Sequence, residues 1–202
     1  MRRIGLFIFA IYLIITITSP VALVHAQEEV VETDTPVGID TIASEGALTQ
    51  SARVDYELPY PGMLPDHPLY ILKVIRDGIV KILINDSMKR ARFSLLSAEK
   101  RMYAGKMLVE KNKDALAIET IGKGNNYLNE ALEAIEVVKK QTPKHTDIRP
   151  FLLQFKAATE KHLEIAKDIS SSIDSDVAGQ FEVESRRIED FHKKAVGMLK
   201  QR

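Results

Sequence analysis

The chain reads L-P-Y-P-G-M-L-P-D-H-P-L-Y from Leu58 to Tyr70, and an apolar run follows at once. Each proline fixes φ, lacks an N–H and biases the residue before it toward extended backbone. Gly62, which follows Pro61, suits the turn position that requires a positive φ. We therefore expect a stiff extended arm over 58–67. The residues that define its signature are Pro59, Pro61, Gly62, Pro65, Pro68 and Tyr70.

The apolar run that follows predicts a helix over 68–84. Pro68 suits the first helical position, with Asp66 or His67 near the cap. One face of this helix is aliphatic at helical spacing and much of the other side is apolar as well. A helix that is apolar nearly all round is normally buried, so we expect this one to be central in the fold. Its apolar residues are Tyr70, Ile71, Leu72, Val74, Ile75, Ile79, Val80, Ile82, Leu83 and Ile84.

A family resemblance rests on the same segment. The run L-P-D-H-P-L-Y at 64–70, with Leu72-Lys73 and Arg76 after it, resembles the signature of the bacterial family called domain of unknown function 5667. Two later runs resemble it too, K-R-A at 89–91 and A-E-K-R at 98–101, so the similarity covers about 55–140. The resemblance implies an extracytoplasmic helical domain behind a signal or membrane segment, which in some relatives accompanies anti-sigma-like regulators. It implies no catalytic residue.

The N-terminus has the features of an export signal. Arg2 and Arg3 precede an apolar run from Ile4 to Ile17, and V-H-A at 24–26 offers a cleavage site before Gln27. We expect a signal peptide over 1–26. The alternative is an uncleaved anchor formed by 4–24, a length that could just span a bilayer. Both readings place the rest of the chain outside the cytoplasm, as a secreted or envelope-associated protein.

Residues 27–52 are predicted to be an acidic disordered spacer, with six acids, no Lys or Arg and few large apolar groups. The remaining chain, 53–202, is expected to fold as one helical domain. It carries a net charge of about +4, which is too small to indicate nucleic-acid binding. The chain has no cysteine, so neither a lipid-modified cysteine nor a disulfide is available and the core alone must stabilise the fold.

The periodicity of the body predicts an all-α antiparallel bundle of about five helices behind the arm. After 68–84, the expected helices are 87–113, 114–140, 147–171 and 175–200, and the short connections between them favour antiparallel neighbours. The expected core stripe of 114–140 consists of Ala117, Ile121, Leu128, Ala131, Ile135 and Val138. Gly122 and Gly124 interrupt that helix, which suggests close helix packing or a kink.

The helix expected at 87–113 is strongly basic, with eight Lys or Arg residues against two acids. Most of the bases lie opposite its core stripe, and a solvated outer face is the simplest explanation. The functional alternative is a contact with anionic lipid or an anionic envelope polymer. Under that alternative the candidate interaction face consists of Arg90, Arg101 and Lys111.

Motifs that would indicate catalysis or metal binding are weak. There is no cysteine nucleophile and no G-x-S-x-G elbow. Glu189 and His192 form one E-x-x-H, but a carboxylate-bridged metal site in a bundle needs a second copy, which the sequence lacks. His162 lies near the apolar stripe of its helix, where a hydrogen-bonded core histidine is the simpler interpretation. We therefore expect no catalytic, cofactor or metal residues.

The sequence favours a non-enzymatic interaction or structural module of the cell envelope, with an envelope polymer, anionic lipid or a membrane protein as partner. The second hypothesis is a membrane-anchored sensory or regulatory ectodomain. A metal-dependent bundle enzyme is a distant third.

Overall fold

The computed structural model describes residues 54–141 and 147–201. The chain divides into two compact units, and the second, Ala47–Arg202, contains all of the described residues. The predicted signal peptide or anchor and the whole predicted acidic spacer therefore lie outside the described residues. Within it there are five helices and no strand, which confirms the all-α class.

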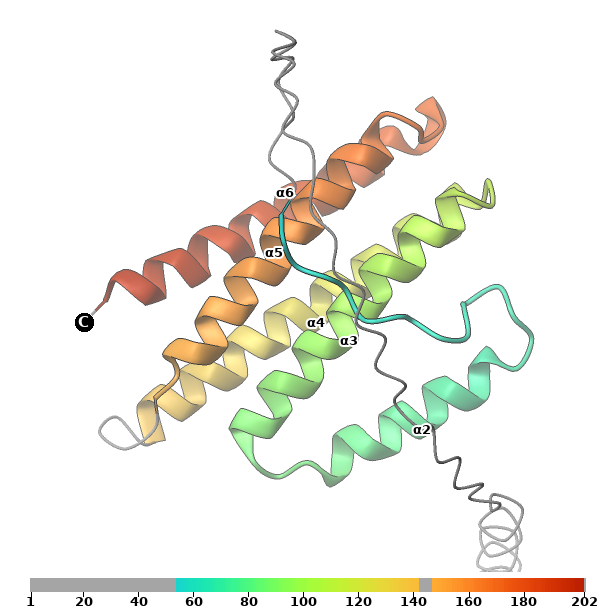
Figure 1. Cartoon of the computed structure of the whole chain (residues 1–202). Helices are drawn as coiled ribbons and strands as arrows, with labels where there is room; N and C mark the ends of the chain where they lie inside the picture. Colours follow the sequence, from blue (N-terminus) through green and yellow to red (C-terminus); the bar gives the residue numbers. More distant parts are fainter. Residues whose placement is uncertain (1–53, 142–146, 202) are drawn as a thin grey trace, which may run out of the picture. The chain divides into compact units, whose positions relative to one another are not determined.

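Four of these helices form the bundle, and each runs close to its predicted range. They are α3 (Ser87–Val109), α4 (Asp114–Gln141), α5 (Arg149–Ser170) and α6 (Ser175–Lys200). Contacts join α3 to α4, α4 to α6, α6 to α5 and α5 to α3, so the four helices close a ring around one core. Figure 1 shows α3 and α4 side by side as one pair and α5 and α6 as the other.

Local chemistry explains where the helices begin and end. The Asp86 carboxylate accepts the Lys89 N–H at 2.7 Å and so caps α3. Asn112 has a positive φ of 56° just after α3, a conformation that asparagine tolerates at helix C-termini. Pro150 stands in the first turn of α5, where its missing N–H costs nothing.

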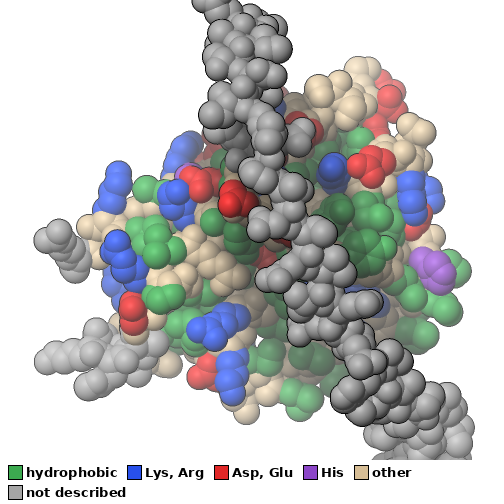
Figure 2. Space-filling model, viewed as in Figure 1, with side chains coloured by type: hydrophobic (Ala, Val, Ile, Leu, Met, Phe, Trp, Pro, Cys, Tyr) green, Lys and Arg blue, Asp and Glu red, His purple; other side chains and the backbone are tan. Residues whose placement is uncertain are grey.

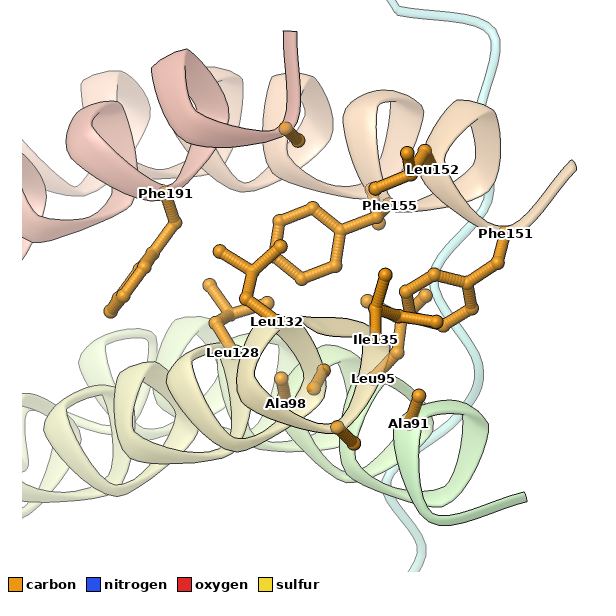
Figure 3. Packing of buried hydrophobic residues seen from close by; sticks show 14 residues of the cluster. Ala91, Leu95, Ala98, Leu128, Leu132, Ile135, Phe151, Leu152, Phe155 and Phe191 are labelled. Carbon is orange, nitrogen blue, oxygen red and sulfur yellow. The ribbon is translucent and has the colours of Figure 1, made fainter. Parts of the chain in front are cut away.

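The interior contains two hydrophobic clusters. In the first, Phe155 points from α5 toward Leu132 of α4 (Figure 3). The second cluster joins α3, α4, α5 and α6 around Ile121 and Ile188 and includes Leu58 of the arm. The stripe predicted for α4 is confirmed in full, because all six of its residues are buried. Burial of such side chains contributes about 1.5–3 kcal/mol each, so these clusters dominate the stability of the bundle.

Glycines allow α3 and α4 to approach closely. A Cβ on Gly124 would lie 3.2 Å from the Cβ of Arg101, and one on Gly105 would lie only 2.4 Å from Cγ1 of Ile121. The sequence pointed to close packing at Gly124 and missed Gly105. The helix α4 is continuous through Gly122 and Gly124, so neither glycine ends it.

The fifth helix, α2 (Tyr70–Leu83), lies outside this bundle, and the prediction that it is central is wrong. None of its residues is buried. It also begins two residues later than expected, because the chain makes turns at His67–Leu69 before the first helical residue, so Pro68 is not the first helical position. None of the described helices, α2 included, is long and apolar enough to cross a membrane.

Candidate functional site

The helix α2 is turned so that its apolar stripe faces outward. All residues of this stripe are exposed. The most exposed is Ile82, near the C-terminal end of α2, with 79% of its surface accessible to solvent. We call this stripe the outward face of α2. It consists of Ile71, Leu72, Ile75, Ile79, Ile82 and Leu83. Scattered exposed aliphatic residues need no explanation, but a contiguous exposed stripe of them indicates an interaction site.

The charged stripe of α2 faces the bundle instead. Lys73, Asp77 and Lys81 recur every four residues, so they share one side of the helix, and all three are half-buried. Lys81 donates to Glu130 of α4 at 2.7 Å and lies over the ring of Tyr127, 5.3 Å from its centroid. Lys81 therefore joins α2 to the bundle through polar contacts, whereas ordinary helix packing turns the apolar stripe inward.

The arm holds the other end of α2. The ammonium group of Lys73 donates to the carbonyl oxygens of Pro61 at 2.7 Å and Met63 at 3.2 Å. Gly62 between them has a φ of 70°, which confirms the predicted positive φ at this glycine. The stiff backbone of the arm thus presents two carbonyls to one lysine, and this fixes where α2 begins relative to the arm.

A cleft of about 240 Å³ lies between α2 and the surface formed by α3 and α4. Its charged lining comprises Lys73, Arg76 and Asp77 from α2 and Lys100 and Arg101 from α3. Four cations thus surround one carboxylate, and that carboxylate is already bonded to Arg76 at 2.8 Å. The cleft is strongly positive.

The protonation of Lys73 reflects this surrounding charge. Burial lowers its pKa, and the positive charges of Lys100, Arg101 and Arg76 lower it further, whereas Asp77 opposes the shift. The same repulsion acts on any extra cation in the cleft and favours an anion.

The predicted interaction residues are not brought together on one free face. Arg90 is exposed and donates to the carbonyl of Ile84 at 3.0 Å. Arg101 lies under α2, 5.3 Å over the ring of Tyr127. Lys111 forms an ion pair with Asp66 of the arm at 3.2 Å. Arg101 therefore belongs to the cleft, and Lys111 helps to fix the arm.

The residues of the proline signature differ in how deeply they are buried. Pro61 is buried beside the buried Leu58 and Leu64, so the arm is packed on the bundle. Pro59 and Pro65 are half-buried, Pro68 is exposed, and Tyr70 is half-buried and lines the cleft. Tyr56, just before the arm, packs against both hydrophobic clusters, whereas Tyr60 in the arm is 67% exposed.

A single acid ties the arm to the end of α3. Asp66 pairs with Lys113 at 2.9 Å as well as with Lys111. The hydrogen bond from Lys113 and the charge of Lys111 hold the pKa of Asp66 below its usual value.

The histidines and the E-x-x-H do not gather at one place. Glu189 pairs with Lys193 at 3.5 Å, while Nδ1 of His192 lies 3.0 Å from the Thr159 hydroxyl. Among residues 54–141 and 147–201 no three His, Asp or Glu side chains form a group that could hold a metal ion. His162 is buried as predicted, but neither ring nitrogen has a hydrogen-bond partner within 54–141 and 147–201, so the prediction of a hydrogen-bonded histidine is wrong there. Burial lowers its pKa to about 3.

Sequence reasoning missed both parts of this site, the outward face of α2 and the cleft beneath it. The available signal was the four-residue spacing of Lys73, Asp77 and Lys81, which places these three charged side chains on one side of the helix. Amphipathic spacing defines two faces but does not say which one meets the bundle. The site offers an apolar surface for burial against a partner and a cationic cleft for an anion.

The comparisons with known proteins bear on the family alone. No curated protein and no solved structure matches this chain. The model of one family, Domain of unknown function (DUF5667), matches residues 62–200, which extends the resemblance noted at 55–140 through α5 and α6. Its match begins at Gly62 in the arm and ends at the last residue of α6, so it includes α2 together with the bundle. The chain belongs to the DUF5667 family.

Proposed function

We propose that this protein is an exported, non-enzymatic module of the cell envelope that docks on an anionic membrane surface through the outward face of α2. The observation that carries the proposal is the orientation of that helix, with its aliphatic stripe outward and its charged stripe toward the bundle. A surface helix of this kind gains free energy by burying its apolar side at the boundary between headgroups and acyl chains.

Charge favours a membrane over a second copy of the chain as the occupant. Between Leu69 and Arg101 there are eight Lys or Arg residues and three acids, a net charge of +5. Arg76, Lys89, Arg90 and Arg92 are exposed among them. Two copies meeting face to face would bring these like charges together, whereas anionic lipid neutralises them. In Figure 2, hydrophobic side chains lie at the surface close to Lys and Arg side chains.

The export signal supports the same compartment. An N-terminal segment with two arginines, an apolar run and a small-residue cleavage site directs a chain across the cytoplasmic membrane. On this proposal 1–26 is removed and the released domain meets the outer leaflet of that membrane. The intact mass of the native protein should correspond to a chain that begins at Gln27, and a full-length mass would show an anchored ectodomain instead.

Vesicle binding tests the docking surface. Residues 47–202, one compact unit with both hydrophobic clusters, are sedimented with vesicles of phosphatidylcholine alone or mixed with phosphatidylglycerol. We expect binding to the anionic vesicles that weakens as salt is raised. The double substitution Ile75→Gln/Ile79→Gln should reduce the partition at least about tenfold, because each buried isoleucine contributes about 1.5–3 kcal/mol.

The matched control makes the same chemical change elsewhere. Val183 of α6 is 56% exposed, close to the 55% of Ile79, and Leu153 of α5 is 49% exposed. Leu153→Gln/Val183→Gln should leave vesicle binding unchanged. If the wild-type domain stays in the supernatant with anionic vesicles, the proposal is wrong. A dimer by light scattering that Ile75→Gln/Ile79→Gln abolishes would assign the outward face to a second copy.

A further inference from the structure

We infer that the cleft between α2 and α3 is a binding site for a phosphate monoester or a similar small dianion. The cleft lies on the bundle side of α2, so it is distinct from the outward face of that helix. Its volume of about 240 Å³ suits a small ligand or a lipid headgroup rather than a peptide.

Two of its four cations have unused hydrogen-bonding capacity. Lys73 is engaged by the arm carbonyls and Arg76 by Asp77. Among the described residues, Lys100 makes no hydrogen bond or ion pair, and the guanidinium of Arg101 contacts the face of the Tyr127 ring without a hydrogen-bond acceptor. Both are half-buried, so their donors are available to a ligand inside the cleft rather than dispersed in solvent.

The arrangement also favours a dianion over a monoanion. The four cations and the Asp77 carboxylate leave the cleft with a net charge of +3. A planar guanidinium can donate two parallel hydrogen bonds to phosphate oxygens, and an ammonium group adds a compact charge. Arg101 lies over the ring of Tyr127, and the ammonium group of Lys81 from α2 lies over the same ring. A ligand would replace repulsion among the bases with attraction, and would tie α2 more firmly to the bundle.

Two soluble probes test this inference without any membrane. Residues 47–202 are titrated calorimetrically with glycerol 1-phosphate and, separately, with dihexanoyl phosphatidic acid below its micelle concentration. We expect one saturable site for at least one probe. Lys100→Gln and Arg101→Gln should each weaken binding about tenfold or more, because each removes a charge-assisted hydrogen bond. Lys140→Gln, which removes an exposed lysine in the last turn of α4, should have no effect.

The two probes also identify the source of the phosphate. Equal affinities support a free phosphate monoester as ligand, and binding of the lipid alone supports a headgroup at the membrane surface. No saturable binding of either probe, or binding that Lys100→Gln and Arg101→Gln leave unchanged, would overturn the inference. Because these probes form no bilayer and the substitutions spare the outward face, this result is separable from that of the vesicle experiment.

Discussion

Tyr56, two residues before the arm, donates its phenolic hydrogen to the carboxylate of Glu99, a buried side chain of α3. Gln154 of α5 lies 3.5 Å from the same hydroxyl. Burial raises the pKa of Tyr56 to about 12, and the Glu99 carboxylate adds to the shift. Burial also raises the pKa of Glu99, which the hydrogen bond from Tyr56 opposes. One hydroxyl therefore joins the segment just before the arm to two helices of the bundle.

Removing this hydroxyl should cost stability. Tyr56→Phe leaves a buried carboxylate without its donor, and we expect a loss of about 1–3 kcal/mol in the free energy of unfolding. Urea denaturation followed by circular dichroism measures it. Tyr60→Phe is the control, because that ring is 67% exposed and the change should be within about 0.5 kcal/mol. Equal small losses in both variants would mean that this segment is not held by this bond.

The stability should fall in acid because of His162. Its pKa is about 3 in the folded state against 6.5 for the free side chain, so between these values only the unfolded state takes up a proton. The stability due to its neutral form is complete above pH 6.5 and decreases as the pH falls. From pH 7.5 to pH 5 this amounts to about 2 kcal/mol.

Substitution isolates this contribution from that of Glu99. The raised pKa of Glu99 acts in the opposite direction, since a protonated Glu99 is favoured in the folded state. The difference in unfolding free energy between wild type and His162→Leu should therefore change by about 2 kcal/mol between the two pH values. His67→Gln, at an exposed position, should leave the pH dependence intact. A parallel decline in wild type and His162→Leu would refute the assignment.

A glycine comparison tests the packing of α3 on α4. Gly105→Ala would place a Cβ 2.4 Å from Cγ1 of Ile121, and we expect a destabilisation of about 1–3 kcal/mol. At Gly179 of α6 a Cβ would meet nothing within 4 Å, so Gly179→Ala should stabilise the protein by about 0.5–1 kcal/mol. Thermal unfolding measures both, and effects of the same sign would contradict this packing.

An isoleucine comparison tests whether α2 lies outside the core. Ile135→Ala removes a fully buried side chain and should cost about 2–5 kcal/mol. Ile79→Ala makes the same change on the outward face, and should alter the unfolding free energy by less than about 1 kcal/mol. Urea denaturation of the domain without lipid gives both values. Comparable losses would place α2 in the core after all.

The bundle could be predicted from the sequence because its helices follow one rule, in which apolar residues at helical spacing face the core. The six residues of the predicted α4 stripe recur at helical spacing from Ala117 to Val138, and all six are buried. The same rule failed for α2, because it identifies an apolar face without fixing what that face meets. Polar partners from distant segments decided its orientation, above all Glu130 for Lys81. These contacts between distant parts of the chain leave no local pattern.

The candidate site was predicted only in part, for a similar reason. Arg101 was selected as a surface contact because it lies opposite the core stripe of α3, yet α2 covers it. Lys111 was selected on the same ground, and its pairing with Asp66 depends on how the arm folds back. The lack of any partner for the His162 ring among the described residues likewise depends on residues far away along the chain.

The two hydrophobic clusters contain no residue of α2. The helix is instead joined to the rest of the domain by an arm, a short connection before Ser87 and a few polar contacts. Substitutions on the outward face can therefore accumulate with little effect on the folding of the bundle, and substitutions in the bundle need not alter that face. Evolution can thus tune what the domain adheres to and how well it folds as two nearly independent traits.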